Sequence, residues 1–299
     1  MKKRMFTIVA LFALIVQVSP LLAENTIVTS FDPFSNNPTP GVWYENDIRT
    51  GGSADIIDLT GTGGDLENNQ PLPIGAAKLT TDFSDAAKAE VGVANNYGKS
   101  ADIFSTLSIT YSYHKASNSG QNISAAPSLK LTFYKSVCED PSSANDCYGT
   151  LVYEPYWNGG DPATDEWTEV TIDQNNGLFW WTGGFGQPNS AGGPPLWTLA
   201  QWFGYFSSDF DEADLILVSV GVGSYNRGQI GYFDDVRISH SFGDSFNESY
   251  DFEPAPQFES LGECVSTLIE DHCFGLTGKD RANCNLEQQT TCFGLFDIK

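Results

Sequence analysis

The sequence comprises 299 residues, of which 40% are hydrophobic and 18% are charged, and its formal net charge at pH 7 is −23. Such a negative field makes nucleic acid and anionic membranes poor partners, which argues against the protein classes that act on them. Charge of this size keeps chains apart in solution, and the many carboxylates also suit a protein that binds divalent cations.

The first 23 residues have the three parts of a secretory signal peptide. Three basic residues at positions 2 to 4 precede an apolar stretch over residues 5–18, and Ala23 ends the segment with a small side chain. A membrane anchor is the alternative, but the apolar stretch is short for a bilayer span, and no later segment is apolar enough to cross a membrane. We expect a mature chain that begins at Glu24 and is secreted or held at the cell surface. Its formal charge is −26, because the leader holds three of the 15 basic residues and no acidic one.

From residue 24 to about residue 245 the sequence shows many short strands separated by Gly, Asn, Asp and Pro. Residues 107–113 alternate between apolar and polar, as in a strand with one buried face. This pattern predicts an all-β fold, a jelly-roll β-sandwich over residues 24–245. One short inserted helix is expected over residues 199–206, where aromatic and apolar residues recur at helical spacing.

The composition changes after residue 245, and residues 246–260 are expected to form a linker. Residues 261–299 predict a small helical hairpin. Ser260 and Glu263 form a capping signature for its first helix, and Gly275 is placed to end that helix. A hairpin of this size cannot hold itself by burial alone, so we expect it to be joined by disulfides and to serve in attachment or self-assembly.

All six cysteines lie after the leader, and their even number is typical of an oxidising compartment. Cys138 and Cys147 flank a turn-rich loop and are expected to bridge each other. In the hairpin, antiparallel helices bring the start of the first near the end of the second. Among three possible pairings, this favours the nested bridges Cys264–Cys292 and Cys273–Cys284. Zinc is a weak alternative, because no His joins either group at a zinc-ligand spacing.

Several segments resemble a jelly-roll region of bacterial secreted and surface proteins, a group that is similar to galactose-binding-like and carbohydrate-binding-module-like sandwiches. The segments are residues 101–113, 126–131, 151–156, 198–200 and 231–236, with Trp167, Trp180 and Trp181. The resemblance covers residues 76–239. It implies the fold, an extracellular or surface location, and an extracellular polysaccharide or cell-envelope glycan as partner. It implies no particular ligand, because such sandwiches carry many functions.

The same resemblance implies a structural calcium ion. In these modules an acidic residue of the first strand and an Asp near the end of the last strand help to hold the ion, and the matching positions are Asp32 and either Asp234 or Asp235. Strand period independently places Asp234 among apolar neighbours, and a carboxylate that faces a core is costly unless it is paired or binds a cation. Calcium, which prefers oxygen ligands, is therefore the expected cofactor. The alternative is an Asp bonded to loop amides or paired with Arg237.

An aromatic cluster is the best candidate for ligand binding. Aromatic faces beside Gly, Asn and Gln suit sugar rings, whose C–H faces stack while their hydroxyls bind amides. Trp180 and Trp181 point to opposite faces of one strand, so one of them is expected in the core. The candidate ligand-binding residues are Trp180, Trp181, Trp197, Asn189, Tyr156 and Trp157.

Two other classes of function remain open. An enzyme of the glycan hydrolase or lyase class needs paired carboxylates, which Glu154, Asp161, Asp165, Glu166 and Glu169 could supply. No motif with a catalytic mechanism accompanies them. An extracellular adhesin or structural subunit would use the sandwich as a spacer and the hairpin for contacts. A non-catalytic binding protein is the prediction, and no catalytic residue is assigned.

Overall fold

The computed structural model describes residues 24–117, 120, 122–138, 140, 144–190, 192–243, 245–255 and 261–295. The signal peptide predicted for residues 1–23 lies outside the described residues. The chain divides into two compact units, Met1–Glu253 and Pro254–Lys299, and each is described by itself.

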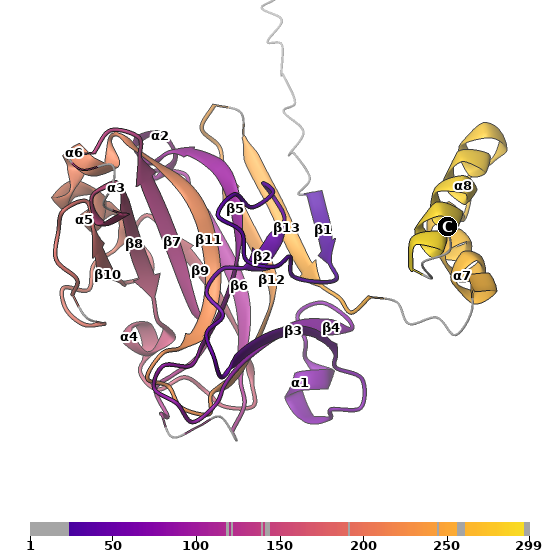
Figure 1. The fold of residues 1–299 in the computed structure, drawn as a ribbon, viewed down its shortest axis with the longest axis horizontal. Coiled ribbons are helices and arrows are strands. Elements are labelled where there is room, and N and C mark those ends of the chain that lie inside the picture. Colours follow the sequence, from indigo (N-terminus) through magenta and orange to yellow (C-terminus); the bar gives the residue numbers. More distant parts are fainter. Residues whose placement is uncertain are drawn as a thin grey trace, which may run out of the picture. The chain divides into compact units, whose positions relative to one another are not determined.

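The first unit is a sandwich of two sheets (Figure 1). The seven-stranded sheet has the order β1-β13-β12-β4-β3, and β6 pairs with both β12 and β9. Its strands are β1 (Glu24–Val28), β3 (Gly52–Asp58), β4 (Gly75–Thr81), β6 (Ser108–Lys115), β9 (Trp167–Asp173), β12 (Ile230–His240) and β13 (Phe246–Phe252). All its pairs are antiparallel except β1 with β13.

The six-stranded sheet is antiparallel throughout and has the order β10-β8-β7-β11-β5-β2. Its strands are β2 (Trp43–Glu45), β5 (Lys88–Lys99), β7 (Ser128–Lys135), β8 (Tyr148–Tyr153), β10 (Phe179–Gly184) and β11 (Ala213–Gly223). On β7, Leu129, Leu131 and Phe133 are fully buried while the residues between them are more exposed, which is the alternation of a strand with one face on a core. One continuous core joins the inner faces of both sheets. The predicted jelly-roll β-sandwich is confirmed.

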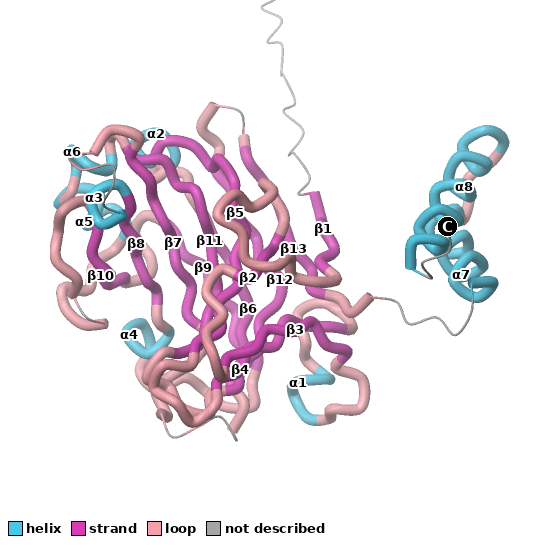
Figure 2. The backbone as a smooth tube through the Cα atoms, in the orientation of Figure 1, coloured by secondary structure: helices cyan, strands magenta, loops and turns pink. Residues whose placement is uncertain are grey.

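In the first unit the helices are short and lie between strands (Figure 2). They are α1 (Gly64–Asn68), α2 (Ser100–Ile103), α3 (Ala144–Cys147), α4 (Pro155–Gly159), α5 (Leu199–Tyr205) and α6 (Ser207–Phe210). The predicted helix over residues 199–206 is confirmed as α5. It begins at a capping box, in which Thr198 and Gln201 bond reciprocally through side chain and backbone. The predicted Cys138–Cys147 bridge is also present.

The linker predicted for residues 246–260 is wrong in its first half. Residues 246–252 form β13, which lies between β12 and β1 in the seven-stranded sheet. Tyr250 and Phe252 enter the core, where both pack edge-on against Trp43. The polar composition of this segment reflects its half-exposed outer face, and the first unit therefore extends to Glu253.

The second unit is the predicted helical hairpin, formed by α7 (Leu261–Cys273) and α8 (Gly278–Leu295). Its disulfides have the predicted nested pairing, Cys264–Cys292 and Cys273–Cys284. The described part of its core is limited to Cys264, Cys273, Cys292, Leu268 and Val265. The bridges therefore supply cohesion that burial in so small a unit cannot provide.

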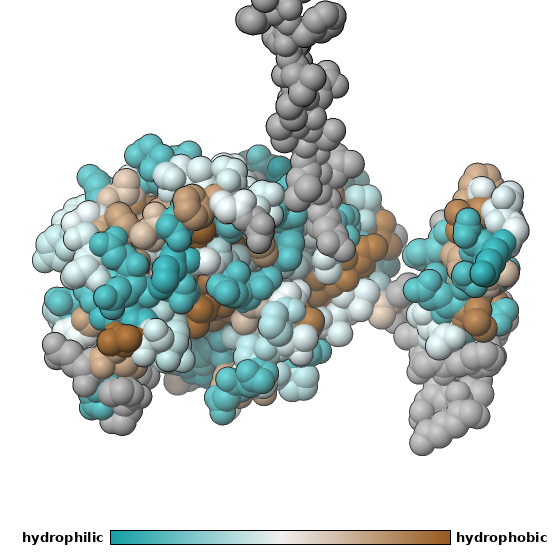
Figure 3. All heavy atoms as spheres, turned by 90° about the horizontal axis from the view of Figure 1, so that it is seen from above, coloured by the Kyte–Doolittle hydropathy of each residue, from teal (hydrophilic) through white to brown (hydrophobic). Residues whose placement is uncertain are grey.

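Hydrophilic residues cover much of one face of the larger unit, and hydrophobic residues show between them in small patches (Figure 3). Among the described residues, no helix has the length and apolar character needed to span a bilayer.

Candidate functional site

A row of neighbouring residues crosses the outer face of the six-stranded sheet. Ladder pairing places these residues side by side from β10 to β2: Trp180, Val152, Lys130, Ser219, Gly92 and Tyr44. Successive residues of a strand point to opposite faces, and the sequence neighbours of this row on β7, β8 and β10 lie in the core. The row therefore faces away from the core.

A cleft lies beside this row, toward the loops that follow β8 and β11. It consists of two adjoining hollows of about 540 and about 510 Å³ that have lining residues in common. We call it the sheet cleft. The residues that line both hollows are Ser128, Glu154, Gly192, Gly223, Ser224, Tyr225 and Asn226. The first hollow is also lined by Arg49, Lys88, Lys130, Val152, Trp180, Thr182 and Asn189.

Glycines on β11 keep part of this cleft free of side chains. Gly221 lies between Ser128 and Glu90 in the sheet, and a Cβ atom there would come within 3.1 Å of the Glu90 side chain. Gly223 has a φ of 77°, and its Cβ would lie 2.4 Å from the carbonyl oxygen of Ala87. Only glycine meets both conditions at position 223, so the backbone itself shapes this wall of the cleft.

A buried ion-pair network lies at the side of the cleft. The Glu90 carboxylate is 5% exposed and contacts the ammonium groups of both Lys88 and Lys130. Its Oε1 atom also accepts hydrogen bonds from Asn46 Nδ2 at 2.7 Å and Ser219 Oγ at 2.9 Å. Burial acts to raise the pKa of Glu90, but the two lysines outweigh it and hold that pKa well below its usual value. The carboxylate is therefore ionised at neutral pH and fixes both lysines beside the cleft.

The network continues to a second carboxylate and an arginine. Lys88 Nζ lies 2.6 Å from Asp47 Oδ2, and Arg49 donates to both Asp47 oxygens, at 2.9 and 2.7 Å. The Arg49 side chain is 48% exposed. It is thus held by a two-point contact while part of its guanidinium remains available to a ligand.

Glu154 is the only acidic residue among the described residues that line the cleft. Burial raises the pKa of its carboxyl, while Trp180, Lys130 and Trp157 act in the opposite direction. The side chain is half-buried and directly follows β8. A carboxyl in this environment takes up a proton more readily than one in water.

Aromatic rings surround the cleft. Trp157, on α4, donates its indole N–H to Gly192 O at 3.0 Å, and its ring centroid lies 5.0 Å from that of Tyr156. Tyr225 is 78% exposed and is anchored through its backbone N–H to Asp85 O at 2.9 Å. Together with Trp180, these rings offer apolar faces beside the polar and charged groups of the cleft.

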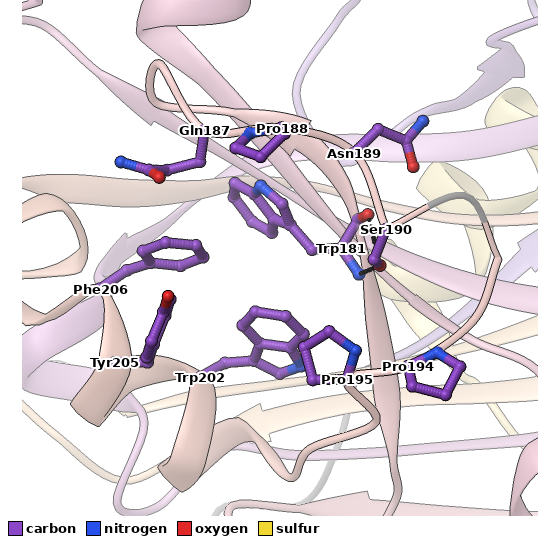
Figure 4. A pocket seen from close by; sticks show the side chains of 10 residues that line it. All are labelled: Trp181, Gln187, Pro188, Asn189, Ser190, Pro194, Pro195, Trp202, Tyr205 and Phe206. Carbon is purple, nitrogen blue, oxygen red and sulfur yellow. Dashed lines mark hydrogen bonds between the residues drawn. The ribbon is translucent and has the colours of Figure 1, made fainter.

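Another hollow, distinct from the two that form the sheet cleft, lies under the loop that follows β10 and is smaller and more apolar (Figure 4). Its volume is about 320 Å³, and the rings of Trp181, Trp202, Tyr205 and Phe206 face it (Figure 4). We call it the aromatic pocket. Three of these rings belong to the core, because Trp181 and Trp202 are each 2% exposed and Phe206 is 7% exposed. Ser190 is already bonded to the backbone of Trp181.

The structure separates the predicted ligand-binding residues. Trp180, Tyr156, Trp157 and Asn189 line the sheet cleft, and Asn189 also borders the aromatic pocket. Trp181 is the member of the adjacent pair that packs in the core, against Phe185, Trp202, Phe206 and Phe210. Trp197 packs against Trp202 at 4.7 Å and is partly buried on the core. Trp181 is thus a core residue, and Trp197 is partly buried.

Several cleft residues were missed by sequence reasoning. Arg49, Lys88, Lys130 and Tyr225 come from four separate segments, and only the sheet order brings them together. The signal for Lys130 was present, since it stands between the core residues Leu129 and Leu131 and must face outward. No comparable signal marks Tyr225, which lies in a loop.

The carboxylates considered for catalysis are dispersed. Glu154 lines the sheet cleft, whereas Glu169 lies on β9 of the other sheet and pairs with Arg237 at 2.6 Å. Asp161 accepts a hydrogen bond from Ser124 Oγ at 2.8 Å, and Asp165 accepts one from Ser117 N at 2.8 Å. Glu166 is exposed.

The predicted metal ligands have three different environments. Asp32 is exposed and forms a backbone bridge with Tyr44. Asp234 is fully buried, and its Oδ1 accepts a hydrogen bond from Phe252 N at 3.1 Å. Asp235 pairs with Arg237 at 3.0 Å. In the described residues, no three His, Cys, Asp or Glu side chains are grouped closely enough to bind a metal by themselves.

A bulge overturns the expected face of β12. The register shifts between Asp234 and Arg237, and Asp235 has a φ of 51°. Phe233 therefore enters the main core before the bulge, and Val236 enters it after the bulge, whereas Tyr232 packs in a separate cluster. Simple alternation along the strand would place Tyr232 and Val236 on the same face of the sheet. The bulge adds one residue, so the residues after it face the opposite side from the one that alternation predicts.

Two carboxyl groups near this bulge are buried without full hydrogen bonding. Asp234 Oδ2 and Asp251 Oδ1 have no hydrogen-bond partner among the described residues. Burial raises the pKa of Asp234 to about 8, and the neighbouring Asp251 contributes to the rise. Burial, together with Glu253, raises the pKa of Asp251 to about 6. Two orphaned carboxylate oxygens in a low-dielectric site fit a cation that prefers oxygen ligands.

No protein-family model matches the sequence, and no curated protein matches it. Similar solved structures include a family 11 carbohydrate-binding module from Clostridium thermocellum in complex with a β-1,3-1,4-mixed-linked tetrasaccharide. It is 10% identical, the match covers 76% of this chain and 97% of that one, and the TM-score is 0.35. An exo-β-agarase is 11% identical over 81% of this chain and 30% of its own, with a TM-score of 0.32. Likenesses of this strength assign no function to this chain.

Proposed function

We propose that this protein is a secreted or surface-held, non-catalytic carbohydrate-binding protein whose binding site is the sheet cleft. The observation that carries the proposal is that aromatic rings and hydrogen-bonding groups from separate strands and loops line one cleft. Trp180, Trp157 and Tyr225 provide stacking faces, and Asn226, Ser224 and Glu154 provide polar partners. This combination suits a sugar, which has an apolar ring face and a polar rim.

Binding is favoured over hydrolysis because the described lining of the cleft contains one carboxylate, Glu154, and glycoside hydrolysis uses two. The three disulfides support an oxidising compartment and hence export. An extracellular polysaccharide or cell-envelope glycan is accordingly the proposed partner.

A pair of tyrosine substitutions tests whether the sheet cleft or the aromatic pocket binds the sugar. Tyr225 lines the sheet cleft and Tyr205 borders the aromatic pocket, and they are 78% and 64% exposed. In titration calorimetry against soluble β-glucan and polygalacturonate, Tyr225→Ala should weaken binding about fivefold, since stacking is worth about 1 kcal/mol per ring. Tyr205→Ala should leave the affinity unchanged. The opposite result would move the site to the aromatic pocket, and absence of binding to any glycan in a broad array would reject the function.

We also propose that the sandwich holds a structural calcium ion, with Asp234 and Asp251 as side-chain ligands. Their orphaned, buried oxygens support this choice over Asp32, which is exposed, and over Asp235, which is paired with Arg237. Calcium binds six to eight oxygens, so backbone carbonyls and water would complete the shell. The ion would neutralise carboxylates that are otherwise costly to bury.

The C-terminal hairpin is proposed as an attachment element. It forms a compact unit of its own, and Phe274 and Leu286 are 86% and 64% exposed on it. Deletion of residues 254–299 should leave glycan binding intact and release the protein from the cell surface into the medium. If the shortened chain is retained like the full chain, the hairpin has no attachment role.

A further inference from the structure

We infer that the sheet cleft binds an acidic polysaccharide, one whose sugar rings carry carboxylate groups, with Arg49, Lys88 and Lys130 as the groups that recognise the anion. This inference rests on the proposed carbohydrate-binding function and narrows its ligand class. It concerns residues that the jelly-roll pattern alone does not specify, because they come from β5, from β7 and from the segment between β2 and β3.

The concentration of cations at this place is unusual for the chain. The sequence has 15 basic residues against 38 acidic ones, and three of the 15 belong to the leader. Three of the remaining basic residues line one hollow, while Glu154 is the only acidic residue in its described lining. Basic side chains thus outnumber acidic ones in the described lining of this hollow, in a protein whose overall charge is strongly negative. A charge arrangement of this kind selects for an anionic group.

The carboxylates behind the cleft do not saturate these cations. An ammonium group has three N–H donors. Among the described residues, Lys88 Nζ makes ion pairs with Asp47 and Glu90, and Lys130 Nζ makes one with Glu90. Donors therefore remain on both lysines, whose side chains are only 12% and 14% exposed and border the cleft. This network joins three basic side chains to two carboxylates.

The spacing between Trp180 and Lys130 suits a sugar that carries a charge. Trp180 and Lys130 belong to the same outward-facing row, separated by Val152 on β8. Neighbouring strands lie about 4.8 Å apart, so a ring stacked on Trp180 reaches Lys130 across about two strand spacings, a distance comparable to one or two sugar units. Burial raises the pKa of Glu154, the one acidic residue in the described lining of this hollow.

The experiment compares three polysaccharides and two matched variants by titration calorimetry. The polysaccharides are polygalacturonate, which carries ring carboxylates, dextran sulfate, which carries sulfate esters, and mixed-linked β-glucan, which is neutral. The variants are Arg49→Gln, in the cleft, and Arg237→Gln, on the other sheet. Both arginines pair with an Asp and are similarly exposed, at 48% and 45%. Melting curves confirm that both variants fold.

Preferred binding of polygalacturonate over the neutral glucan supports the inference, as does a loss of about tenfold in affinity for Arg49→Gln with no loss for Arg237→Gln. Preference for the neutral glucan, with Arg49→Gln unchanged, overturns the acidic ligand while leaving carbohydrate binding in place. Preference for dextran sulfate overturns the carboxylate as the recognised group. Failure to bind any of the three, or any glycan in an array, rejects both the inference and the proposed function. Lys130→Met serves as a second cleft variant and should reduce polygalacturonate binding by a similar factor.

Discussion

The buried carboxyl of Asp234 gives a calcium prediction with a definite dependence on pH. Its pKa is raised from 3.8 to about 8 by burial, so between these values the folded protein keeps a proton that the unfolded chain releases. The free energy of unfolding must therefore fall as the pH rises from about 4 to about 8 in metal-free protein. At about 1.4 kcal/mol per pKa unit, the loss over this range is about 5 kcal/mol. Asp251, with a pKa of about 6, acts in the same direction.

Calcium should remove this loss, because the ion takes the place of the proton on Asp234. Stabilisation by calcium should therefore be small near pH 5 and large near pH 8, and calcium affinity should rise up to tenfold per pH unit below the pKa. Urea unfolding of the full chain at pH 5, 6, 7 and 8, with 5 mM calcium or with EDTA, measures both effects. Asp234→Asn should abolish the calcium response. Asp235→Asn is the matched control and should retain it, because that carboxylate pairs with Arg237.

Equal unfolding curves in calcium and in EDTA at pH 8 would refute the site. A calcium response that survives in Asp234→Asn but is lost in Asp235→Asn would place the ion elsewhere on β12. A metal-free protein whose stability does not fall between pH 5 and pH 8 would show that Asp234 is not held in the low-dielectric environment described here.

Three further outcomes follow from the packing. Trp181→Ala should destabilise the sandwich by about 3–5 kcal/mol, measured by urea unfolding, because the ring is 2% exposed in the core; near-native stability would return this ring to the list of ligand platforms. Glu90→Gln should cost about 3 kcal/mol, because it leaves Lys88 and Lys130 buried without their shared partner. The Glu90 contribution is present above a pH of about 4.5 and is lost as the pH falls, since its folded-state pKa is depressed; a variant with the same acid sensitivity as the wild type would contradict this. Reduction should raise hydrogen exchange throughout the C-terminal hairpin while the sandwich keeps its protection, and a hairpin still protected in dithiothreitol would show that burial alone holds it.

Much of the fold was predictable because its signals are local. These signals each act over a few residues: apolar–polar alternation along β6 and β7, helical spacing of apolar residues within α5, and the positions of the cysteines in the hairpin. β13 was not predictable in this way. Its polar residues occupy a half-exposed face, and its place in the sheet depends on contacts with β1, more than 200 residues earlier in the chain. Only the completed sheet shows why Tyr250 and Phe252 are needed in the core.

Part of the candidate site could be predicted from the sequence, and strand geometry explains which part. Successive residues along β10 face opposite sides of the sheet, so only one of Trp180 and Trp181 could face outward. The sequence does not show which side lies on the core, so it could not say which tryptophan faces outward. The sequence pattern also favoured the densest aromatic segment, and density of aromatic residues is as typical of a core as of a ligand site. Lys130 would have been a better guide, since a charged residue between two core residues of a strand fixes the outward direction.

The proposed calcium ligands show how one irregular residue changes a functional assignment. Period-two alternation correctly identified Asp234 as buried but explained it by the wrong face, because the bulge at Asp235 was invisible in the sequence. The bulge turns Asp235 toward Arg237 and leaves Asp234 beside Asp251 of β13. Asp251 lies within the segment that had the composition of a linker, so the second ligand could not be recognised until that segment was known to be a strand. Recognition of the proposed metal site therefore depends on recognition of β13 as a strand. The pH-dependent calcium response tests that proposed site.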